Sequence, residues 1–173
     1  MLVDKIGAGK RAPYVVNVVI EIPAMAQPIK YEIDKDSGAL VVDRFLATPM
    51  FYPCNYGFIP GTVAGDNDPI DVLVWCPYHL SPGVVIASKI IGVLDMEDEA
   101  GEDYKLIAVP DSKISPSFDH INDVKDLPKE LLDQIKHFFE HYKDLEPNKW
   151  VKVREFKSKD HAIELVKTSI RSL

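Results

Sequence analysis

Three aspartates stand within six residues of this 173-residue chain, at Asp66, Asp68 and Asp71. Carboxylates set this close raise one another's pKa, because each disfavours ionisation of its neighbours. A bound cation removes that cost, and clustered hard oxygen ligands favour Mg²⁺, Mn²⁺ or Ca²⁺ over zinc or copper. An EF-hand is excluded, because its glycine position is Asp71 and its final glutamate position is Pro77. The alternatives are a divalent-cation site and a solvated Asp-Pro turn.

Acids and bases also alternate along two expected strands. Lys30-Tyr31-Glu32 and Asp103-Tyr104-Lys105 each place an acid and a base on one face, since side chains two apart share a face of a strand. Each alone would be a surface ion pair of small energetic value. Together with Glu21 on an otherwise apolar strand, they predict a shared polar cavity at a barrel mouth. Arg44 lies in an apolar segment and needs a partner.

Two other motifs do not fit the chemistry they resemble. Residues 7–11 end like a phosphate loop, but Asp4 stands where the first glycine belongs and Arg11 replaces the Ser/Thr that contacts Mg²⁺. His137 and His141 have the spacing of a zinc protease, but Phe138 replaces the required glutamate. We expect the histidines to lie on a helix face or at a subunit contact.

Composition narrows the class of protein further. The 27 acidic and 20 basic residues give a formal charge of −7, which argues against binding to nucleic acid or to anionic membranes. No apolar run approaches the ~20 residues that span a bilayer, and the N-terminus lacks a signal-peptide pattern. Cys54 and Cys76 are too few for a disulfide framework. We expect one cytoplasmic domain over residues 1–173, with reduced thiols.

The first two-thirds of the chain predict strands. They are expected at residues 14–22, 29–33, 40–46, 71–76, 84–94 and 104–109, where valine and isoleucine are frequent. Alternation over residues 14–22 places Ile20 and Ile22 on one face and Glu21 on the other. Asp71 therefore begins a strand directly after the acidic segment.

The last third predicts helices. Apolar residues recur at helical spacing over 131–142, Pro128 suits the first turn, and Ser158 is the expected N-cap of a C-terminal helix. Short strands followed by helices favour a mixed, mainly β fold. We predict a small closed five-stranded, OB-like β-barrel with flanking α-helices.

Residues 66–72, Asp-Asn-Asp-Pro-Ile-Asp-Val, resemble the signature of the soluble Mg²⁺-dependent inorganic pyrophosphatases, in their compact bacterial form. Further blocks resemble the same family in the same order, at residues 18–23, 30–32, 52–60, 98–105 and 141–143. The resemblance implies hydrolysis of pyrophosphate to two orthophosphates with several Mg²⁺ per subunit, Mn²⁺ being a possible substitute. It also implies a metal-activated water and a homohexamer, with residues 137–144 as a candidate contact.

The resemblance implies a role for each matching residue. Expected metal ligands or their supports are Asp66, Asp71, Asp103, Asp98 and Glu21. Asp68 is expected to take a proton from the attacking water, Glu32 to orient water, and Tyr56 to donate a hydrogen bond with Tyr52 as its neighbour. Expected phosphate-binding groups are Lys30, Arg44, Lys105, Tyr142 and Lys143.

Two other hypotheses remain open from the sequence. One is a Mg²⁺-dependent hydrolase of nucleotides or polyphosphate, although the chain offers no long base-binding or polymer-binding segment. The other is an oligonucleotide-binding barrel, which would need a basic groove with exposed aromatics. The net charge of −7 opposes this second hypothesis.

Overall fold

The computed structural model describes residues 5–34 and 36–171. Within these residues the strands are β1 (Val15–Ile22), β2 (Ile29–Ile33), β3 (Leu40–Phe45), β4 (Asn55–Phe58), β5 (Asp71–Val74), β6 (Val85–Asp98), β7 (Gly101–Pro110) and β8 (Val151–Lys157). The helices are α2 (Lys129–His141) and α3 (Lys159–Ser169), with short 3₁₀ turns at Pro116–Phe118 and Val124–Asp126. The chain is therefore mainly β, as predicted.

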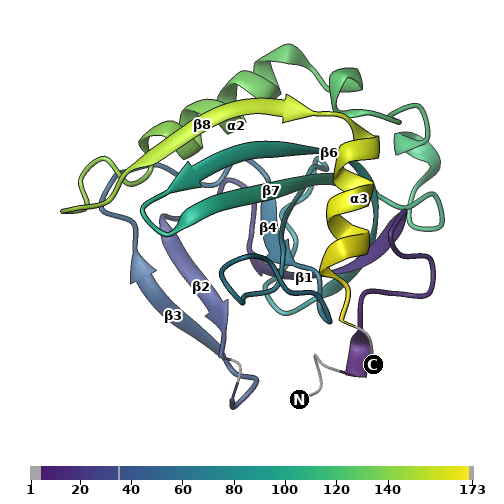
Figure 1. Ribbon diagram of the computed structural model, residues 1–173, viewed down its shortest axis with the longest axis horizontal. Coiled ribbons are helices and arrows are strands. Elements are labelled where there is room, and N and C mark those ends of the chain that lie inside the picture. The colour runs from purple at the N-terminus through teal and green to yellow at the C-terminus, as the bar shows by residue number, and fades with distance from the viewer. Residues whose placement is uncertain (1–4, 35, 172–173) are drawn as a thin grey trace.

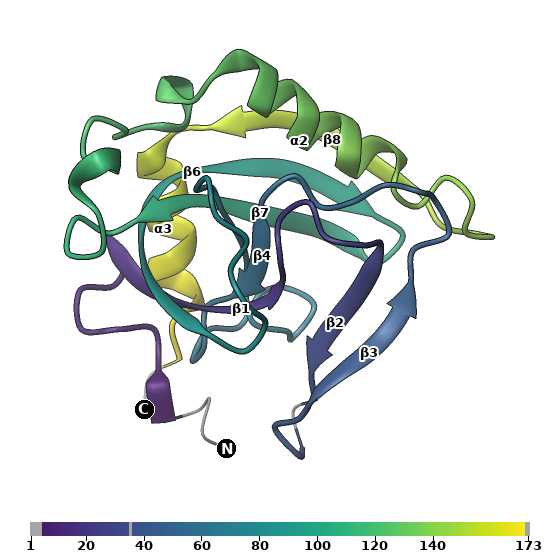
Figure 2. The ribbon, with the colours of Figure 1, turned by 180° about the vertical axis from the view of Figure 1, so that it is seen from behind.

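Five strands close into a ring. Strand β1 pairs antiparallel with both β4 and β6, so the order β1-β4-β5-β7-β6 returns to its start. Strands β5 and β7 run parallel, and β8 extends the sheet beyond β6. Strands β2 and β3 form a separate two-stranded sheet that stands away from the ring (Figures 1 and 2). The predicted five-stranded barrel is confirmed.

The two helices cover two different cores. One core packs α2, through Ile135 and Phe138, against residues such as Leu73 and Ile107. The other packs α3, through Ile163, against the alternate strand positions. Because neighbouring strand residues point to opposite faces, β5, β6 and β7 each contribute to both cores.

The structure corrects three expectations about the strands. A register shift between Ile20 and Ile22 breaks the alternation, so Ile22 joins the α2 core while Ile20 stays in the α3 core. Strand β4 lies where no strand was predicted, in a four-residue segment too short for a clear period. Strand β8 lies in the region expected to be helical.

Both predicted helices are present. Pro128 is the N-cap residue of α2 and so lies just before the first turn rather than within it. The Ser158 hydroxyl accepts from the His161 amide at 3.5 Å, which confirms Ser158 as the N-cap of α3. No helix in the described part of the chain is both long and apolar enough to cross a membrane.

Glycine at position 57 permits a close approach of two barrel strands. Gly57 lies opposite Ile20 in the pairing of β1 with β4. A Cβ atom at residue 57 would lie 1.9 Å from the carbonyl oxygen of Val19 and 2.9 Å from the Cα of Ile20. Because these are backbone atoms, only a shift of β1 would make room for a side chain.

Candidate active site

A buried lysine joins two of the expected metal ligands. Asp71 lies opposite Lys105 where β5 and β7 run parallel. The Lys105 Nζ lies 2.5 Å from Asp71 Oδ2 and 2.8 Å from Asp103 Oδ1, with the residue only 4% exposed. Burial lowers the pKa of Lys105, but Asp71, the Tyr56 hydroxyl and Asp103 outweigh it and raise the pKa well above its ordinary value. The ammonium therefore stays charged.

Tyr56 completes this cluster from β4. Its hydroxyl donates to Asp71 Oδ2 at 2.5 Å and accepts from Lys105 Nζ at 3.2 Å. Burial, followed by the charge of Asp71, raises the pKa of Tyr56 well above its ordinary value, so the hydroxyl keeps its proton. The ring of Tyr52 lies 5.0 Å from the ring of Tyr56 and also packs on Phe138. This aromatic packing holds the Tyr56 ring in place.

The other two aspartates lie on the acid loop, which we define as residues 65–70. The Asp68 amide donates to Asp66 Oδ1 at 2.9 Å, and the Asp68 carbonyl accepts from Ala64 at 2.7 Å. Between the aspartates, Asn67 has a φ of 68°, in the left-handed region that asparagine tolerates better than most residues. This local backbone bonding holds Asp66 and Asp68 just before β5.

Two cavities meet at Asp71. A cavity of about 670 Å³ is lined by acids from three parts of the chain, namely Glu21, Glu32, Asp34, Asp36, Asp68 and Asp71. A second cavity of about 340 Å³ is lined by Asp66, Asp71, Glu102 and Asp103. The residues expected to share one polar cavity are therefore divided: Glu21 and Glu32 line the larger cavity and Asp103 lines the smaller one, while Lys30 and Lys105 line neither. Asp68 of the acid loop lines the larger cavity and Asp66 the smaller one.

Glu21 is the most strongly perturbed acid of the larger cavity. It is 8% exposed, and its Oε1 accepts from the Ile33 amide at 2.8 Å. Burial first, with further contributions from Asp71 and Glu32, raises the pKa of Glu21 to about 8. A carboxyl in this setting gains most from a nearby cation, so Glu21 fits the role of a metal ligand or its support.

We expect Glu21→Gln to remove a pH-dependent loss of stability from the metal-free protein. The folded pKa of about 8 lies above the ordinary value of 4.5, so the stabilising effect of the bound proton is complete below 4.5 and is lost as pH rises through 8. Glutamine cannot ionise, and its amide oxygen can still accept from Ile33. The difference in unfolding free energy between Glu21→Gln and wild type should therefore grow by up to about 1.4 kcal/mol per pH unit between pH 4.5 and 8, and level off above pH 8.

Urea unfolding in EDTA at pH 5, 7 and 9 measures this gap. The exposed Glu155→Gln removes the same charge from β8 and should show no comparable pH dependence. If the unfolding free energies of wild type and Glu21→Gln changed in parallel with pH, folding would not raise the pKa of Glu21.

The remaining expected phosphate-binding cations each lie beside a carboxylate, although none of them lines either acidic cavity. Lys30 Nζ lies 2.5 Å from Glu32 and 3.5 Å from Asp43, which confirms the predicted pairing along β2. Lys143 Nζ lies 2.8 Å from Asp98 Oδ2. These two lysines thus have counter-ions on neighbouring segments.

Arg44 has the partner that its sequence context requires. Its Nε lies 3.5 Å from Glu146 Oε1 and 3.6 Å from Asp43 Oδ2. Neither is an ideal hydrogen bond, and the buried Nε atom and Glu146 Oε2 have no hydrogen-bond partner among the described residues. The sequence assigned no role to Asp43, Glu99 or Glu146. Glu99 and Glu146 pair with Lys143 and Arg44, which lie far away along the chain, so no local spacing marks them.

The structure brings some expected residues together and leaves others apart. Tyr56, Asp71, Asp103 and Lys105 form one contacting cluster, while Lys30 with Glu32 and Lys143 with Asp98 form separate pairs. Within the described ranges, no three His, Cys, Asp or Glu side chains converge as a ready metal site. The donors are nonetheless carboxylate oxygens, which suit Mg²⁺, and Lys105 occupies the place of a cation between two of them.

A small barrel whose mouth combines clustered carboxylates with lysines and an arginine is the setting of a hydrolase for a densely anionic substrate. Comparison with known proteins makes the class specific. The family model for inorganic pyrophosphatase matches residues 18–173, and the chain belongs to the inorganic pyrophosphatase family, the enzymes that hydrolyse pyrophosphate. The resemblance drawn from the sequence is therefore confirmed.

Inorganic pyrophosphatases from several bacteria are similar in sequence to this chain over most of its length. The inorganic pyrophosphatase of Escherichia coli K12 is 63% identical over 155 residues, which cover 90% of this chain and 88% of the relative. That of Yersinia pestis is 62% identical over 153 residues, covering 88% and 87%. The solved structure of an inorganic pyrophosphatase from Coxiella burnetii superposes with a TM-score of 0.91 at 51% identity, covering 95% of this chain and 97% of that one.

Proposed function

We propose that this chain hydrolyses pyrophosphate to two orthophosphates in the acid-lined cavity, with several Mg²⁺ per subunit and Mn²⁺ as a possible substitute. The observation that carries the proposal is the cluster in which Asp71 contacts both Tyr56 and Lys105 where the two acidic cavities meet. Family membership supplies the substrate. The cluster supplies a place where carboxylates and a phosphate-binding cation act side by side.

The proposed metal-holding residues are Asp66, Asp71, Asp103, Asp98 and Glu21. All five carry hard oxygen donors, and three of them line the smaller cavity. When bound, Mg²⁺ would offset the charge of pyrophosphate and acidify the attacking water. Lys105 would then share Asp71 and Asp103 with the metal and turn toward substrate phosphate.

The proposed chemistry divides between bases, donors and cations of this chain. Asp68 takes the proton of the attacking water and Glu32 orients that water, both from the wall of the larger cavity. Tyr56 donates a hydrogen bond to Asp71, since its hydroxyl keeps its proton, and so orients this proposed metal ligand. The proposed phosphate-binding groups are Lys30, Arg44, Lys105, Tyr142 and Lys143. Four of these are cations already beside carboxylate oxygens, which phosphate oxygens can replace.

Phosphate release from pyrophosphate, ATP and polyphosphate, each assayed with Mg²⁺ and with EDTA, tests the proposal. With Mg²⁺ we expect rapid phosphate release from pyrophosphate but not from ATP or polyphosphate. With EDTA we expect no phosphate release from any of the three. Faster release from ATP or polyphosphate would favour the alternative hydrolase, and full activity in EDTA would remove the role of the metal.

We expect Asp71→Asn to raise the Mg²⁺ concentration for half-maximal activity by more than about tenfold, because affinity for a hard cation depends on ligand charge. The change keeps the side chain's size, and Lys105 retains Asp103 at 2.8 Å. The measurement is the Mg²⁺ activation curve, with Glu155→Gln as a control for the loss of one exposed charge. An unchanged midpoint would mean that Asp71 does not hold metal.

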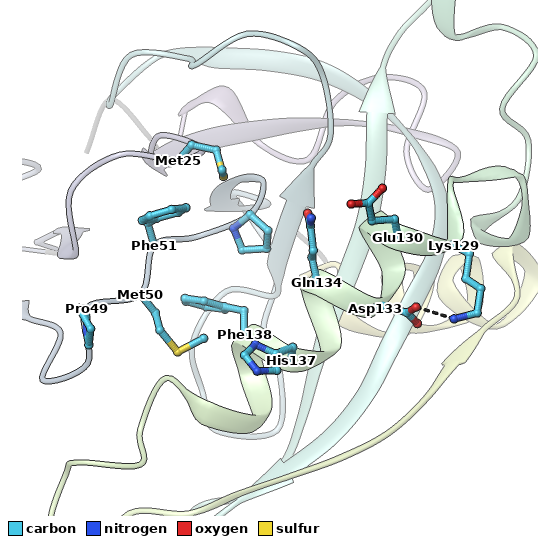
Figure 3. A pocket seen from close by; sticks show the side chains of 11 residues that line it. Met25, Pro49, Met50, Phe51, Lys129, Glu130, Asp133, Gln134, His137 and Phe138 are labelled. Carbon is cyan, nitrogen blue, oxygen red and sulfur yellow. Dashed lines mark hydrogen bonds and ion pairs between the residues drawn. The ribbon is translucent and has the colours of Figure 1, made fainter.

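We further propose that the chain forms a homo-oligomer, a hexamer by family resemblance, and acts in the cytoplasm without nucleic acid or membrane. A third cavity of about 780 Å³ lies between α2 and nearby loops, with Met25, Met50 and Phe51 near His137 and Phe138 (Figure 3). Met25 and Phe51 are 51% and 46% exposed. A second copy of the chain would cover them, and His137 lies in the segment expected at this contact. Sedimentation of the purified protein measures the subunit number.

A further inference from the structure

The segment that follows α3 returns to the barrel and pairs with residues 61–63. The Ser169 carbonyl accepts from the Val63 amide at 2.8 Å, and the Arg171 amide donates to the Gly61 carbonyl at 3.0 Å. Between these two bonds, Thr62 and Ile170 form an antiparallel bridge. Three successive residues at the end of the described chain are thus fixed to three successive residues of another segment.

The same residues 61–63 form the base of the acid loop. The Thr62 hydroxyl is buried, donates to the Ile59 carbonyl at 2.7 Å and accepts from the Ile70 amide at 3.0 Å. The amide of Ile59 donates to the Ile70 carbonyl at 3.1 Å. Thr62 therefore ties together the two ends of the segment that carries Asp66 and Asp68.

Helix α3 fixes the other side of this pairing to the barrel. Ala162, Ile163 and Val166 are buried in the core that α3 shares with the barrel strands. The contacts run from this core through residues 169–171 and residues 61–63 to the acid loop. The acid loop thus has one support in β5, which begins at Asp71, and a second in the C-terminal segment.

We propose that residues 169–171 are a positioning element of the active site, which sets Asp66 and Asp68 in place relative to Asp71. The proposal rests on the proposed function, because it assumes that these aspartates do the chemistry. Strand β5 fixes Asp71 directly, whereas Asp66 and Asp68 precede the strand. Their positions depend on the base of the loop, and geometry loose by about 1 Å is enough to slow a reaction substantially.

The test compares Arg171→Pro with Arg171→Ala. Proline lacks the amide hydrogen that bonds to Gly61, whereas alanine keeps it, and both variants lose the guanidinium that borders the larger cavity. Ile170 has φ −66° and ψ 123°, the extended conformation that a residue before proline adopts, so the change fits the backbone on that side. The difference between the two variants isolates one backbone hydrogen bond.

We expect Arg171→Pro to lower kcat for pyrophosphate and to raise the Mg²⁺ midpoint, each by about fivefold relative to Arg171→Ala, as one hydrogen bond allows. The melting temperature in EDTA should be lower for Arg171→Pro by about 4 °C at most, the effect of one hydrogen bond in a chain of this length. Identical kinetics in the two variants, or a lower melting temperature with unchanged kinetics, would overturn the proposal.

A second pair of variants tests the next link. Thr62→Val removes the hydroxyl that joins Ile59 to Ile70, and Thr62→Ser restores it. We expect the valine variant to lose activity and the serine variant to recover most of it; equal activity of both would count against the proposal. Two further results separate the two levels. Unchanged turnover in Asp68→Asn would refute the role of Asp68 that this proposal assumes, whereas no phosphate release from pyrophosphate by the wild type would refute the proposed function itself.

Discussion

Replacing Asp68 with asparagine is expected to lower kcat for pyrophosphate by about 10²- to 10⁴-fold, the usual effect of losing a general base. Asparagine has nearly the same size but cannot take a proton from water at neutral pH. The backbone bonds of residue 68, from Ala64 to its carbonyl and from its amide to Asp66, do not depend on the carboxylate. The fold and the Mg²⁺ midpoint should therefore change little.

Steady-state kinetics at saturating Mg²⁺ measure this effect, with Asp36→Asn as the matched control. Asp36 lines the same cavity and has no role in the proposed chemistry, so its loss removes equal charge without removing the base. Wild-type turnover in Asp68→Asn would refute the role of Asp68. An equal fall in both variants would indicate a general effect of cavity charge.

The second large effect is expected on stability. Gly57→Ala places a methyl group 1.9 Å from the Val19 carbonyl oxygen, so β1 and β4 must separate where the barrel closes. We expect a loss of at least about 4 kcal/mol of unfolding free energy. For a chain of this length, that corresponds to a fall of about 10 °C or more in Tm.

Thermal unfolding in EDTA measures this loss without a contribution from bound metal. Gly65→Ala is the control, since a Cβ at residue 65 would meet no atom within 4 Å. It should stay within about 1 kcal/mol of wild type. A Tm for Gly57→Ala close to that of wild type would show that the two strands can separate at low cost.

The sequence predicted pairings that depend on local spacing. Lys30 and Glu32 lie two apart on β2 and form an ion pair, as alternation requires. The contact between Asp71 and Lys105 could not be predicted in this way, because it depends on the parallel pairing of β5 with β7. Register between distant strands is set by the closed barrel as a whole, and no local pattern encodes it.

The missed elements have similar physical causes. Asn55–Phe58 is four residues long and contains Gly57, so its strand character comes from pairing on both sides rather than from propensity. The alternation over β1 failed at Glu21, where a register shift turns Ile22 toward the α2 core. Such irregularities are common near active sites, where they redirect a side chain.

Lys105 gives the protein an internal counter-ion when magnesium is scarce. The repulsion between Asp71 and Asp103 is partly offset by one ammonium, 2.5 and 2.8 Å from their carboxylate oxygens. Metal-dependent folds such as zinc fingers come apart when their ion is removed. Here we expect the metal-free protein to stay folded. A fall in magnesium concentration would then lower the activity without unfolding the protein.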